Sequence, residues 1–290
     1  MKRNKNNLTI ALQKDGRLTE PSLNLLRGMG LEFEVDARRL LAPCRNFDLD
    51  ILFLRSGDIP EHIAAGAVDL GVVGENVLFE HGARLRVLER LGFGQCQLMI
   101  AVPKASGLRR LRDLRGLRVA TTYPRSLKKF LARKKVAASI VEISGSVEAA
   151  PALGIADAVC DLVATGSTLR INELVPLETV FSSEAVLAAN GVAPRGRKGA
   201  QIERLRMRAR SVRTARRAKY IMLNAPESAL PRIKRVIPSL KSPTVIPLAE
   251  PGMIAVHSVV DEEVLWDVIE KIKRLGGSEI LVMSIEKEIP

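Results

Sequence analysis

The sequence contains few aromatic, cysteine and histidine residues. Aromatic residues make up 3% of the 290 positions, and cysteine and histidine occur three times each. Any hydrophobic core must therefore be mainly aliphatic. Cys44, Cys96 and Cys160 lie far apart, and the histidines share no short spacing, so the sequence offers neither a zinc motif nor a disulfide framework. An odd, sparse set of cysteines predicts free thiols in a reducing compartment.

Long apolar runs are also missing. No run approaches the roughly 20 residues of a membrane-spanning helix. The basic amino-terminal segment leads only into LTIAL (8–12), which is too short for a secretory signal. We therefore expect a cytoplasmic protein without a membrane partner. Hydrophobic residues make up 47% and charged residues 27%, which excludes a wholly disordered chain, and the length predicts two or three domains.

Negative charge is in deficit. Lys and Arg outnumber Asp and Glu by 45 to 32, a net charge of +13, which favours polyanionic partners. The excess is concentrated in residues 195–219, where eleven basic residues accompany one acid, Glu203. This stretch is either the solvated face of a helix or a surface for nucleic acid. Tyr220 is the only aromatic residue nearby, so a nucleic-acid partner is the less favoured alternative.

Short aliphatic runs alternate with helical patterns, which is typical of an α/β fold. Helices are predicted over 20–29 and 125–133, each with apolar residues on one side. The predicted strands are LTIAL (8–12), DILFLR (50–55), LGVVG (70–74), QLMIAVP (97–103), LRVATTY (117–123), SIVEI (139–143) and LVAT (162–165).

Two passages resemble each other, AVDLGVVG (67–74) and AVCDLVATG (158–166). Each reads Asp-Leu, then an aliphatic strand, then glycine. This internal similarity indicates two lobes, each with a strand that ends at a glycine-containing turn. Because ligands of open α/β sheets bind beyond the carboxyl ends of strands, a ligand between the lobes would contact both turns.

Residues 217–290 follow a different order. Strands are predicted over 218–225, 243–249, 253–260 and 278–287, with helices over 226–236 and from the N-cap Asp261 to Gly276. The order βαββαβ predicts a ferredoxin-like domain.

The segment DLVATGSTLRIN (161–172) carries the clearest chemical signal. An acid and a strand precede Thr165-Gly166-Ser167-Thr168, and a helix follows. Backbone N–H groups and hydroxyls in such a turn can hold a terminal phosphate, and Asp161 can accept hydrogen bonds from sugar hydroxyls. A turn of this kind also occurs without any ligand, so both interpretations stay open on the residues alone.

Eight strings along the chain resemble the long form of the ATP phosphoribosyltransferase family, the first enzyme of histidine biosynthesis. They are QKDGRL (13–18), DIP (58–60), VDLGVVGEN (68–76), ATTYP (120–124), SGSVEAAP (144–151), DLVATGSTL (161–169), AKYIMLNAP (218–226) and SPTVIPLA (242–249). The resemblance implies two periplasmic-binding-protein-like lobes with a central cleft and a C-terminal ferredoxin-like regulatory domain. We expect the first catalytic lobe to comprise 1–104 and 187–216, the second 105–186, and the regulatory domain 217–290.

The implied reaction joins ATP to phosphoribosyl pyrophosphate: adenine N1 attacks the ribose C1 and pyrophosphate leaves. The resemblance assigns catalytic roles to Glu148, Asp161 and Arg17. Magnesium is expected on the substrate's pyrophosphate, with no dedicated protein metal site. The residues implied to bind phosphoribosyl pyrophosphate are Asp161, Ala164, Thr165, Gly166, Ser167 and Thr168.

Other residues are candidates for the ATP side of the cleft. Lys14, Gly16 and Arg17 form a basic glycine turn whose cations can meet phosphate. The remaining candidates are Arg55, Asp69, Gly71, Glu75 and Tyr123. Structural interpretations stay open for three of them: Arg17 as a surface charge, Glu75 as a helix-capping acid and Tyr123 as a core residue.

The resemblance also implies feedback inhibition by histidine and a homo-oligomer that shifts between dimer and hexamer. The implied histidine contacts are Asn224, Leu240, Thr244 and Glu279. Asn224 stands where the family usually has an acid, which predicts weaker histidine binding because charge-assisted hydrogen bonds are stronger than neutral ones. Two other function classes stay open, a two-lobed solute-binding protein and a regulatory subunit that uses the basic stretch.

Overall fold

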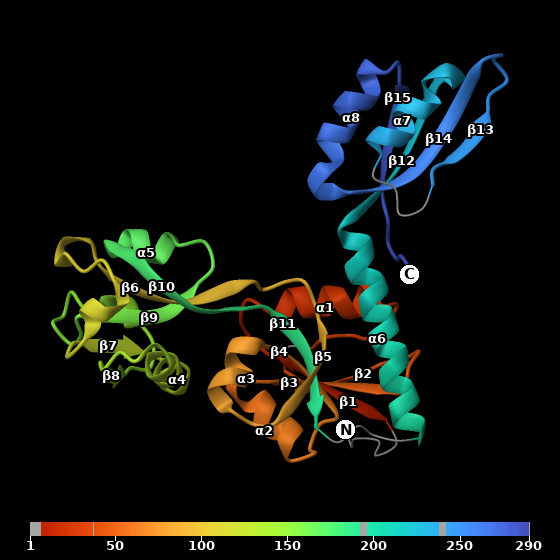
Figure 1. Ribbon diagram of the computed structural model, residues 1–290. Helices are drawn as coiled ribbons and strands as arrows, with labels where there is room; N and C mark the ends of the chain where they lie inside the picture. Colours follow the sequence, from red (N-terminus) through yellow and green to blue (C-terminus); the bar gives the residue numbers. More distant parts are fainter. Residues whose placement is uncertain (1–6, 37, 192–195, 238–241, 290) are drawn as a thin grey trace. The chain divides into compact units, whose positions relative to one another are not determined.

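The computed structural model describes residues 7–36, 38–191, 196–237 and 242–289 (Figure 1). The chain forms two compact units. The first comprises Met1–Asn24 and Leu31–Ile202, and the second comprises Leu25–Gly30 and Glu203–Pro290. Within the described residues, no helix is long and apolar enough to cross a membrane.

The first lobe of the first unit is a six-stranded sheet. Its strands lie in the order β2 (Leu41–Pro43), β3 (Leu49–Leu54), β1 (Leu8–Gln13), β4 (Leu70–Gly74), β11 (Ala185–Asn190) and β5 (Leu85–Arg90). The associated helices are α1 (Thr19–Gly28), α2 (Ile59–Ala64) and α3 (Glu75–His81). The central strands β1 and β4 are buried along nearly their whole length, as expected of parallel strands covered on both faces.

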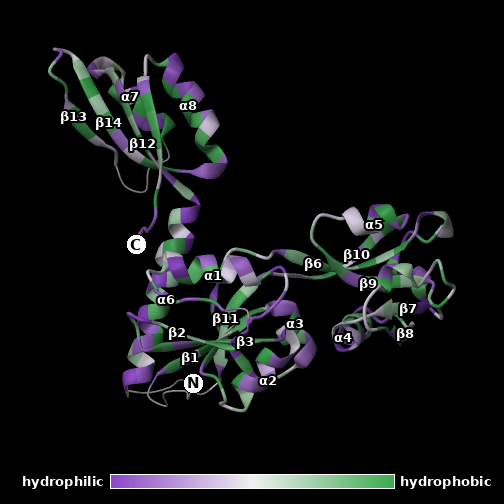
Figure 2. Ribbon diagram, turned by 180° about the vertical axis from the view of Figure 1, so that it is seen from behind, coloured by the Kyte–Doolittle hydropathy of each residue, from purple (hydrophilic) through white to green (hydrophobic). Residues whose placement is uncertain are grey.

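The second lobe is a five-stranded sheet. Its order is β10 (Leu174–Ser183), β6 (Cys96–Pro103), β9 (Ala158–Val163), β7 (Arg118–Thr121) and β8 (Ser139–Glu142). The helices are α4 (Pro124–Lys134) and the short α5 (Ser167–Ile171). Leu127, Phe130 and Leu131 of α4 pack into the core of this lobe, which confirms the predicted apolar side of that helix. In Figure 2, hydrophobic residues (green) predominate in the strands, whereas the helices carry both hydrophobic and hydrophilic residues.

The two lobes share one topology. In the first lobe β1 pairs in parallel with β3 and β4, and β11 runs antiparallel to β4 and to β5. In the second lobe β7 pairs in parallel with β8 and β9, while β6 runs antiparallel to β9 and to β10. The strands β4 and β9 are therefore equivalent, and they carry the two similar sequence passages. The predicted α/β fold with two periplasmic-binding-protein-like lobes is confirmed.

Two predicted lobe boundaries are wrong. Residues 96–103, which we assigned to the first lobe, form β6 in the sheet of the second lobe, whereas residues 185 and 186 belong to β11 of the first lobe. An aliphatic run predicts a strand but does not say which sheet the strand joins. The chain crosses between the lobes before β6 and again between β10 and β11.

The second unit contains the predicted ferredoxin-like domain. Its sheet order is β13 (Thr244–Pro247), β14 (Met253–Asp261), β12 (Ala218–Pro226) and β15 (Ser278–Ser284), with α7 (Leu230–Val236) and α8 (Leu265–Arg274). Ile221, Leu223 and Val256 lie in a core shared with both helices. Asp261 accepts a hydrogen bond from the N–H of Glu263 at 2.9 Å, which confirms the predicted N-cap. Short 3₁₀ turns occur at Ser56–Asp58, Lys104–Ser106, Leu111–Leu114, Val147–Ala149, Glu227–Ala229 and Glu262–Val264.

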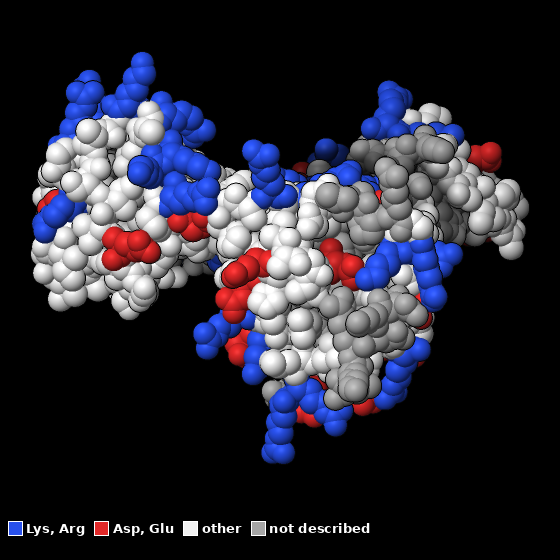
Figure 3. Space-filling model, turned by 90° about the horizontal axis from the view of Figure 1, so that it is seen from below, with Lys and Arg blue, Asp and Glu red and all other residues white. Residues whose placement is uncertain are grey.

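The basic stretch forms a helix, α6 (Gly196–Arg216), while Arg195 lies outside the described residues. Many of its cations are paired within the protein. Lys198 bonds both carboxylate oxygens of Asp69 at 2.9 and 3.0 Å, and just beyond the helix Lys219 pairs with Glu262 at 2.8 Å. On the face in Figure 3, basic side chains are scattered among neutral and acidic ones. These pairs favour a structural role for the stretch over a nucleic-acid surface.

Candidate active site

The candidate site lies at the carboxyl edge of the second-lobe sheet. Because β7, β8 and β9 run parallel, the segments that follow them meet at one edge. Tyr123 follows β7, Glu148 lies in the 3₁₀ turn after β8, and residues 164–168 follow β9. Three strings that stand apart in the sequence thus converge on one place.

The loop after β9 turns sharply at Gly166, whose φ of +74° is a left-handed conformation that favours glycine. The first hydrogen bond of α5 runs from the N–H of Arg170 to the carbonyl of Gly166 at 3.2 Å, so the N–H groups of Ser167 and Thr168 have no partner within the helix. The hydroxyls of Thr165 and Ser167 lie 3.0 Å apart. Because α5 is short, these donors rather than a helix dipole make the loop suitable for an anion.

A pocket of about 290 Å³ opens over this loop. Its lining combines donors from the loop, two acids and one cation from the first lobe. The lining residues are Arg17, Glu148, Val159, Asp161, Leu162, Val163, Ala164, Thr165, Gly166, Ser167, Thr168 and Leu169. All predicted catalytic residues and all predicted phosphoribosyl contacts therefore lie together.

Asp161 is an acid of this pocket whose pKa is shifted by its surroundings. Burial raises its pKa, and the charge of Glu148 raises it further. The N–H of Leu162, which donates to Asp161 Oδ1 at 2.7 Å, and the charge of Arg17 both act in the opposite direction. Because burial has removed water from this carboxylate, it binds strongly to any hydroxyl or cation that a ligand supplies.

The first lobe contributes the glycine turn after β1. Arg17 Nη2 donates to Cys96 Sγ at 3.0 Å, at the start of β6, so a second-lobe strand helps to fix the guanidinium. Gly16 has a φ of +132°, and a Cβ there would lie 2.2 Å from Gln13 Nε2. The N–H of Lys14 donates to the carbonyl of Leu54 at 2.8 Å, which brings Lys14 beside Arg55. These cations lie at the carboxyl ends of β1 and β3, as predicted.

The predictions for Asp69 and Gly71 are wrong. Asp69 precedes β4 at the amino edge of the sheet, where it accepts the N–H of Thr9 at 2.8 Å and pairs with Lys198. That edge is roughly 16 Å from the turn after β1, at about 3.3 Å per residue. Gly71 lies within β4, where a Cβ would approach Ile59 Cγ2 to 2.6 Å. Gly71 allows close packing against α2, whereas Asp69 is held by Thr9 and Lys198. Neither residue lies at the carboxyl end of β4.

Glu75 also departs from its predicted role as an ATP contact. Glu75 begins α3 and is only 4% exposed, and its carboxylate pairs with Arg90 at 2.7 Å. Arg90 in turn pairs with Glu184 at 3.2 Å, beside the crossing from β10 to β11. Burial raises the pKa of Glu75, whereas Arg90 lowers it. The interpretation of Glu75 as a helix-capping acid is also wrong, because Gly74 is the N-cap residue of α3 and Glu75 lies in the first turn.

Asn76 is a residue that sequence reasoning did not select, although it ends the string VDLGVVGEN. It is buried, and its Nδ2 donates to Tyr123 Oη at 3.1 Å. Its Oδ1 accepts from Ser183 Oγ at 3.0 Å. Asn76 therefore connects the first lobe, the second lobe and the strand that joins them. Tyr123 packs partly on the second-lobe core, which supports its core interpretation, and its contact with ATP stays a prediction.

The predicted histidine contacts lie in the second unit. Asn224 Nδ2 donates to Glu279 Oε2, which places a carboxylate beside the neutral amide. Thr244 begins β13 and pairs in register with His257 of β14. Leu240 lies outside the described residues. Glu279 has a φ of +48°, an uncommon conformation for a residue other than glycine.

No group of three or more His, Cys, Asp or Glu side chains in the described part of the chain could hold a metal ion. Asp161 and Glu148 nevertheless give the pocket two carboxylates that could ligate a metal ion. This set suits a magnesium ion that arrives on substrate phosphates, because magnesium takes one or two carboxylates and keeps water and phosphate ligands.

Comparisons with known proteins agree with this architecture. The family model described as ATP phosphoribosyltransferase matches residues 55–211, and the model for the HisG C-terminal domain matches 215–287. ATP phosphoribosyltransferases of Cytophaga hutchinsonii and Bacteroides thetaiotaomicron are 45% and 43% identical over 282 residues, covering 97% of this chain and 98% and 99% of theirs.

A solved structure leads to the same family. The ATP phosphoribosyl transferase (HisG:HisZ) complex from Thermotoga maritima matches with a TM-score of 0.60 and 27% identity, covering 70% of this chain and 98% of that chain. The two family models match in sequence order and together cover the first lobe from residue 55 onward, the second lobe and the ferredoxin-like domain. This chain therefore belongs to the ATP phosphoribosyltransferase family, the enzymes of the first step of histidine biosynthesis.

Proposed function

We propose that phosphoribosyl pyrophosphate binds in the pocket of the second lobe, with its 5-phosphate on loop 164–168 and its ribose beside Asp161 and Glu148. One observation carries this proposal: a single pocket joins phosphate donors, two acids and the cation of Arg17. Acids accept hydrogen bonds from ribose hydroxyls, and the loop donates to phosphate. The three parts thus match the three parts of the substrate.

The same residues are suited to the transfer step. Adenine N1 of ATP forms a bond to the ribose C1, and the bond from C1 to the pyrophosphate oxygen breaks with its electron pair on that oxygen. The positive charge that adenine gains makes its 6-amino group acidic, and that group then loses one proton to water. Asp161 and Glu148 stabilise positive charge that develops on the ribose, and Arg17 stabilises negative charge on pyrophosphate. Asp161 and Glu148 would hold a magnesium ion bound to the substrate's phosphates, and that ion would neutralise part of their charge.

ATP takes the first-lobe side of the cleft in this proposal. Lys14 and Arg55 lie at neighbouring strand ends, where both cations can reach its phosphates. The hydroxyl of Tyr123 is held by Asn76 at the lobe junction, where it can orient the adenine. The chemistry then rests on positioning and electrostatics, since adenine N1 already carries a lone pair.

Replacement of one acid tests this assignment. Asp161→Asn removes the charge and keeps the shape, so we expect kcat/KM for phosphoribosyl pyrophosphate to fall at least about tenfold, the value of one charged hydrogen bond. The KM for ATP should change little. The measurement is magnesium-dependent pyrophosphate release. Glu142→Gln, an exposed acid on β8, is the matched control, and equal kinetics in both variants would refute the assignment.

We further propose that histidine inhibits the enzyme at the ferredoxin-like domain, in a homo-oligomer that shifts between dimer and hexamer. Glu279 supports the histidine part of this proposal. Its carboxylate lies at the amide of Asn224, so it can supply the negative charge that Asn224 itself lacks. A histidine amine would then find a charged acceptor, and inhibition need not be weakened.

A further inference from the structure

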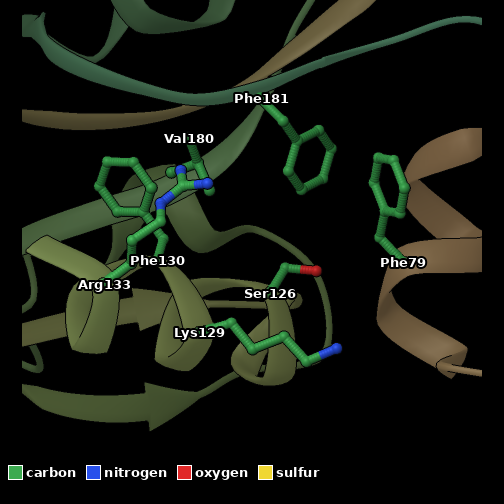
Figure 4. A pocket seen from close by; sticks show the side chains of 7 residues that line it. All are labelled: Phe79, Ser126, Lys129, Phe130, Arg133, Val180 and Phe181. Carbon is green, nitrogen blue, oxygen red and sulfur yellow. The ribbon is translucent and has the colours of Figure 1, made fainter.

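A second pocket lies between α3, α4 and β10, away from loop 164–168. Its volume is about 340 Å³. It is lined by Phe79, Ser126, Lys129, Phe130, Arg133, Val180 and Phe181. Figure 4 shows the rings of Phe79 and Phe181 side by side, with the Arg133 guanidinium near the Phe130 ring. None of these residues lines the phosphoribosyl pocket.

The apolar part of this pocket is suited to a flat ring. Phe79 and Phe181 meet edge to face, with 4.9 Å between their centroids. Phe79 nevertheless leaves 44% of its surface exposed. Aromatic rings prefer offset or edge contacts with other rings, and each such contact adds to the gain from burial. A planar ligand that entered here would cover the exposed face of Phe79.

The polar part of the pocket has an excess of positive charge. Lys129 and Arg133 make no ion pair with any described acid, and Arg133 lies 5.5 Å from the Phe130 ring centroid. The nearby acids have other partners. Both carboxylate oxygens of Glu80 accept the N–H groups of Arg125 and Ser126, and Glu178 pairs with Lys134 at 3.2 Å. An anion is therefore the ligand that these two cations select.

Ser126 provides an independent observation. The residue is 6% exposed, and its Oγ has no hydrogen-bond partner in the structure. A buried hydroxyl without a partner costs free energy, and Figure 4 shows this hydroxyl on the α4 side of the pocket, directed toward the space below Phe79 and Phe181. A ligand oxygen would relieve that cost.

From these contacts we propose that the pocket binds a small aromatic carboxylate, with its ring against Phe79 and Phe181 and its carboxylate near Lys129, Arg133 and Ser126. The ligand would contact α3 of the first lobe and α4 and β10 of the second. The site is separate from the sites proposed for ATP, phosphoribosyl pyrophosphate and histidine, and it does not depend on those proposals.

The test uses the full chain and 1-naphthoate as the probe, with binding measured by calorimetry and saturation-transfer NMR. We expect 1-naphthoate to bind and its neutral analogue 1-naphthalenemethanol to bind at least about tenfold more weakly, since charged hydrogen bonds contribute most. Binding should persist with ATP, phosphoribosyl pyrophosphate or histidine at saturation. Loss of binding in the presence of a substrate would assign the probe to the catalytic cleft and overturn the proposal.

Variants locate the probe. Lys129→Ala combined with Arg133→Ala should weaken 1-naphthoate at least about tenfold. Lys128→Ala combined with Arg112→Ala removes the same charge from exposed positions of the same lobe and should leave binding unchanged. Phe79→Ala, at a half-exposed position, should also weaken binding. Equal affinity in all variants would overturn the proposal, as would absence of 1-naphthoate binding by the parent protein. If Phe79→Ala then also changed the oligomeric state, the pocket would be a subunit contact.

Discussion

At the scale of single residues, Asp161 links the folding of the second lobe to the chemistry proposed for it. The residue lies in β9 opposite Met99 of β6, so a central strand fixes its backbone. Its neighbours leave it partly buried beside another acid, which raises its pKa. In the proposed complex, the ligand supplies further hydrogen-bond partners that the protein does not provide. Only the ionised form of this acid accepts hydrogen bonds from ribose hydroxyls on both oxygens and carries the negative charge that the transfer step needs.

This property predicts a pH dependence. A raised pKa means that the folded protein takes up the proton at a higher pH than an ordinary aspartate, so kcat/KM for phosphoribosyl pyrophosphate should fall as the pH drops through that raised pKa. Asp161→Asn should lack this acidic limb. Both proteins meet the same substrate ionisation, so the difference between the two profiles isolates Asp161. An identical acidic limb in the variant would show that another group titrates.

Single residues differ in how well the sequence predicts them. Loop 161–168 could be found because the same short string supplies strand, glycine and hydroxyls, and the fold keeps them adjacent. Asp69 and Gly71 stand in an equally clear motif, yet they lie at the amino edge and in the middle of β4. Asn76 was missed because its partners, Tyr123 and Ser183, are 47 and 107 positions away. Only the fold brings such residues together.

At the scale of elements, helix α4 receives its cap from a helix of the other lobe. Glu80 on α3 accepts the N–H of Arg125 at 2.8 Å and that of Ser126 at 2.9 Å. Arg125 Nη1 also donates to the carbonyl of His81 at 2.8 Å. Pro124 occupies the first turn, where its missing N–H is harmless. The contact therefore satisfies the start of α4 and joins the lobes at the same time.

Loss of this cap should loosen the start of α4. Glu80→Ala removes both acceptors, at a cost of about 0.5–2 kcal/mol for a helix N-cap, and hydrogen exchange of a peptide covering 124–134 should accelerate several-fold. Glu80→Gln keeps one acceptor oxygen and should have a smaller effect. Glu142→Ala serves as the control. Unchanged exchange in Glu80→Ala would mean that the cap contributes nothing to the stability of α4.

Elements with continuous apolar runs could be predicted, whereas irregular ones could not. Strands β1, β4 and β6 follow directly from their aliphatic sequences. Strand β10 contains Pro176 and two register shifts against β6, so its pattern departs from regular alternation. Strand β5 is a largely exposed edge strand with charged residues, so its sequence lacks the regular alternation of apolar and polar residues. The predicted strand 162–165 begins earlier, at Ala158, and ends at Val163.

At the scale of the whole molecule, the chain divides into two compact units, and the family assignment covers both. The two-lobed solute-binding alternative shares the lobes with this chain, but the match of the HisG C-terminal domain over 215–287 distinguishes them. The order βαββαβ was predictable because each element has a simple pattern and ends at a turn. The exchange of β6 and β11 between the lobes was not, since it depends on long-range pairing.

The proposed inhibition by histidine also belongs to the scale of the whole molecule. If Glu279 supplies the charge for a histidine amine, Glu279→Gln should raise the histidine concentration needed for half-inhibition about tenfold or more, with no change in the rate measured without histidine. Glu250→Gln, an exposed acid of the same domain, is the control. A variant that histidine inhibits as strongly as it inhibits the parent protein would remove Glu279 from this role.

Calorimetric binding of phosphoribosyl pyrophosphate to a pair of glycine variants tests most directly whether loop 164–168 holds the phosphate. Gly166→Ala and Gly107→Ala impose similar backbone strain, because φ is +74° and +73° and neither Cβ meets a close neighbour. Only Gly166 lies in the pocket. We expect Gly166→Ala to lose affinity at least about tenfold and Gly107→Ala to bind like the parent protein. Equal affinity in the two variants would contradict the claim that this loop holds the phosphate.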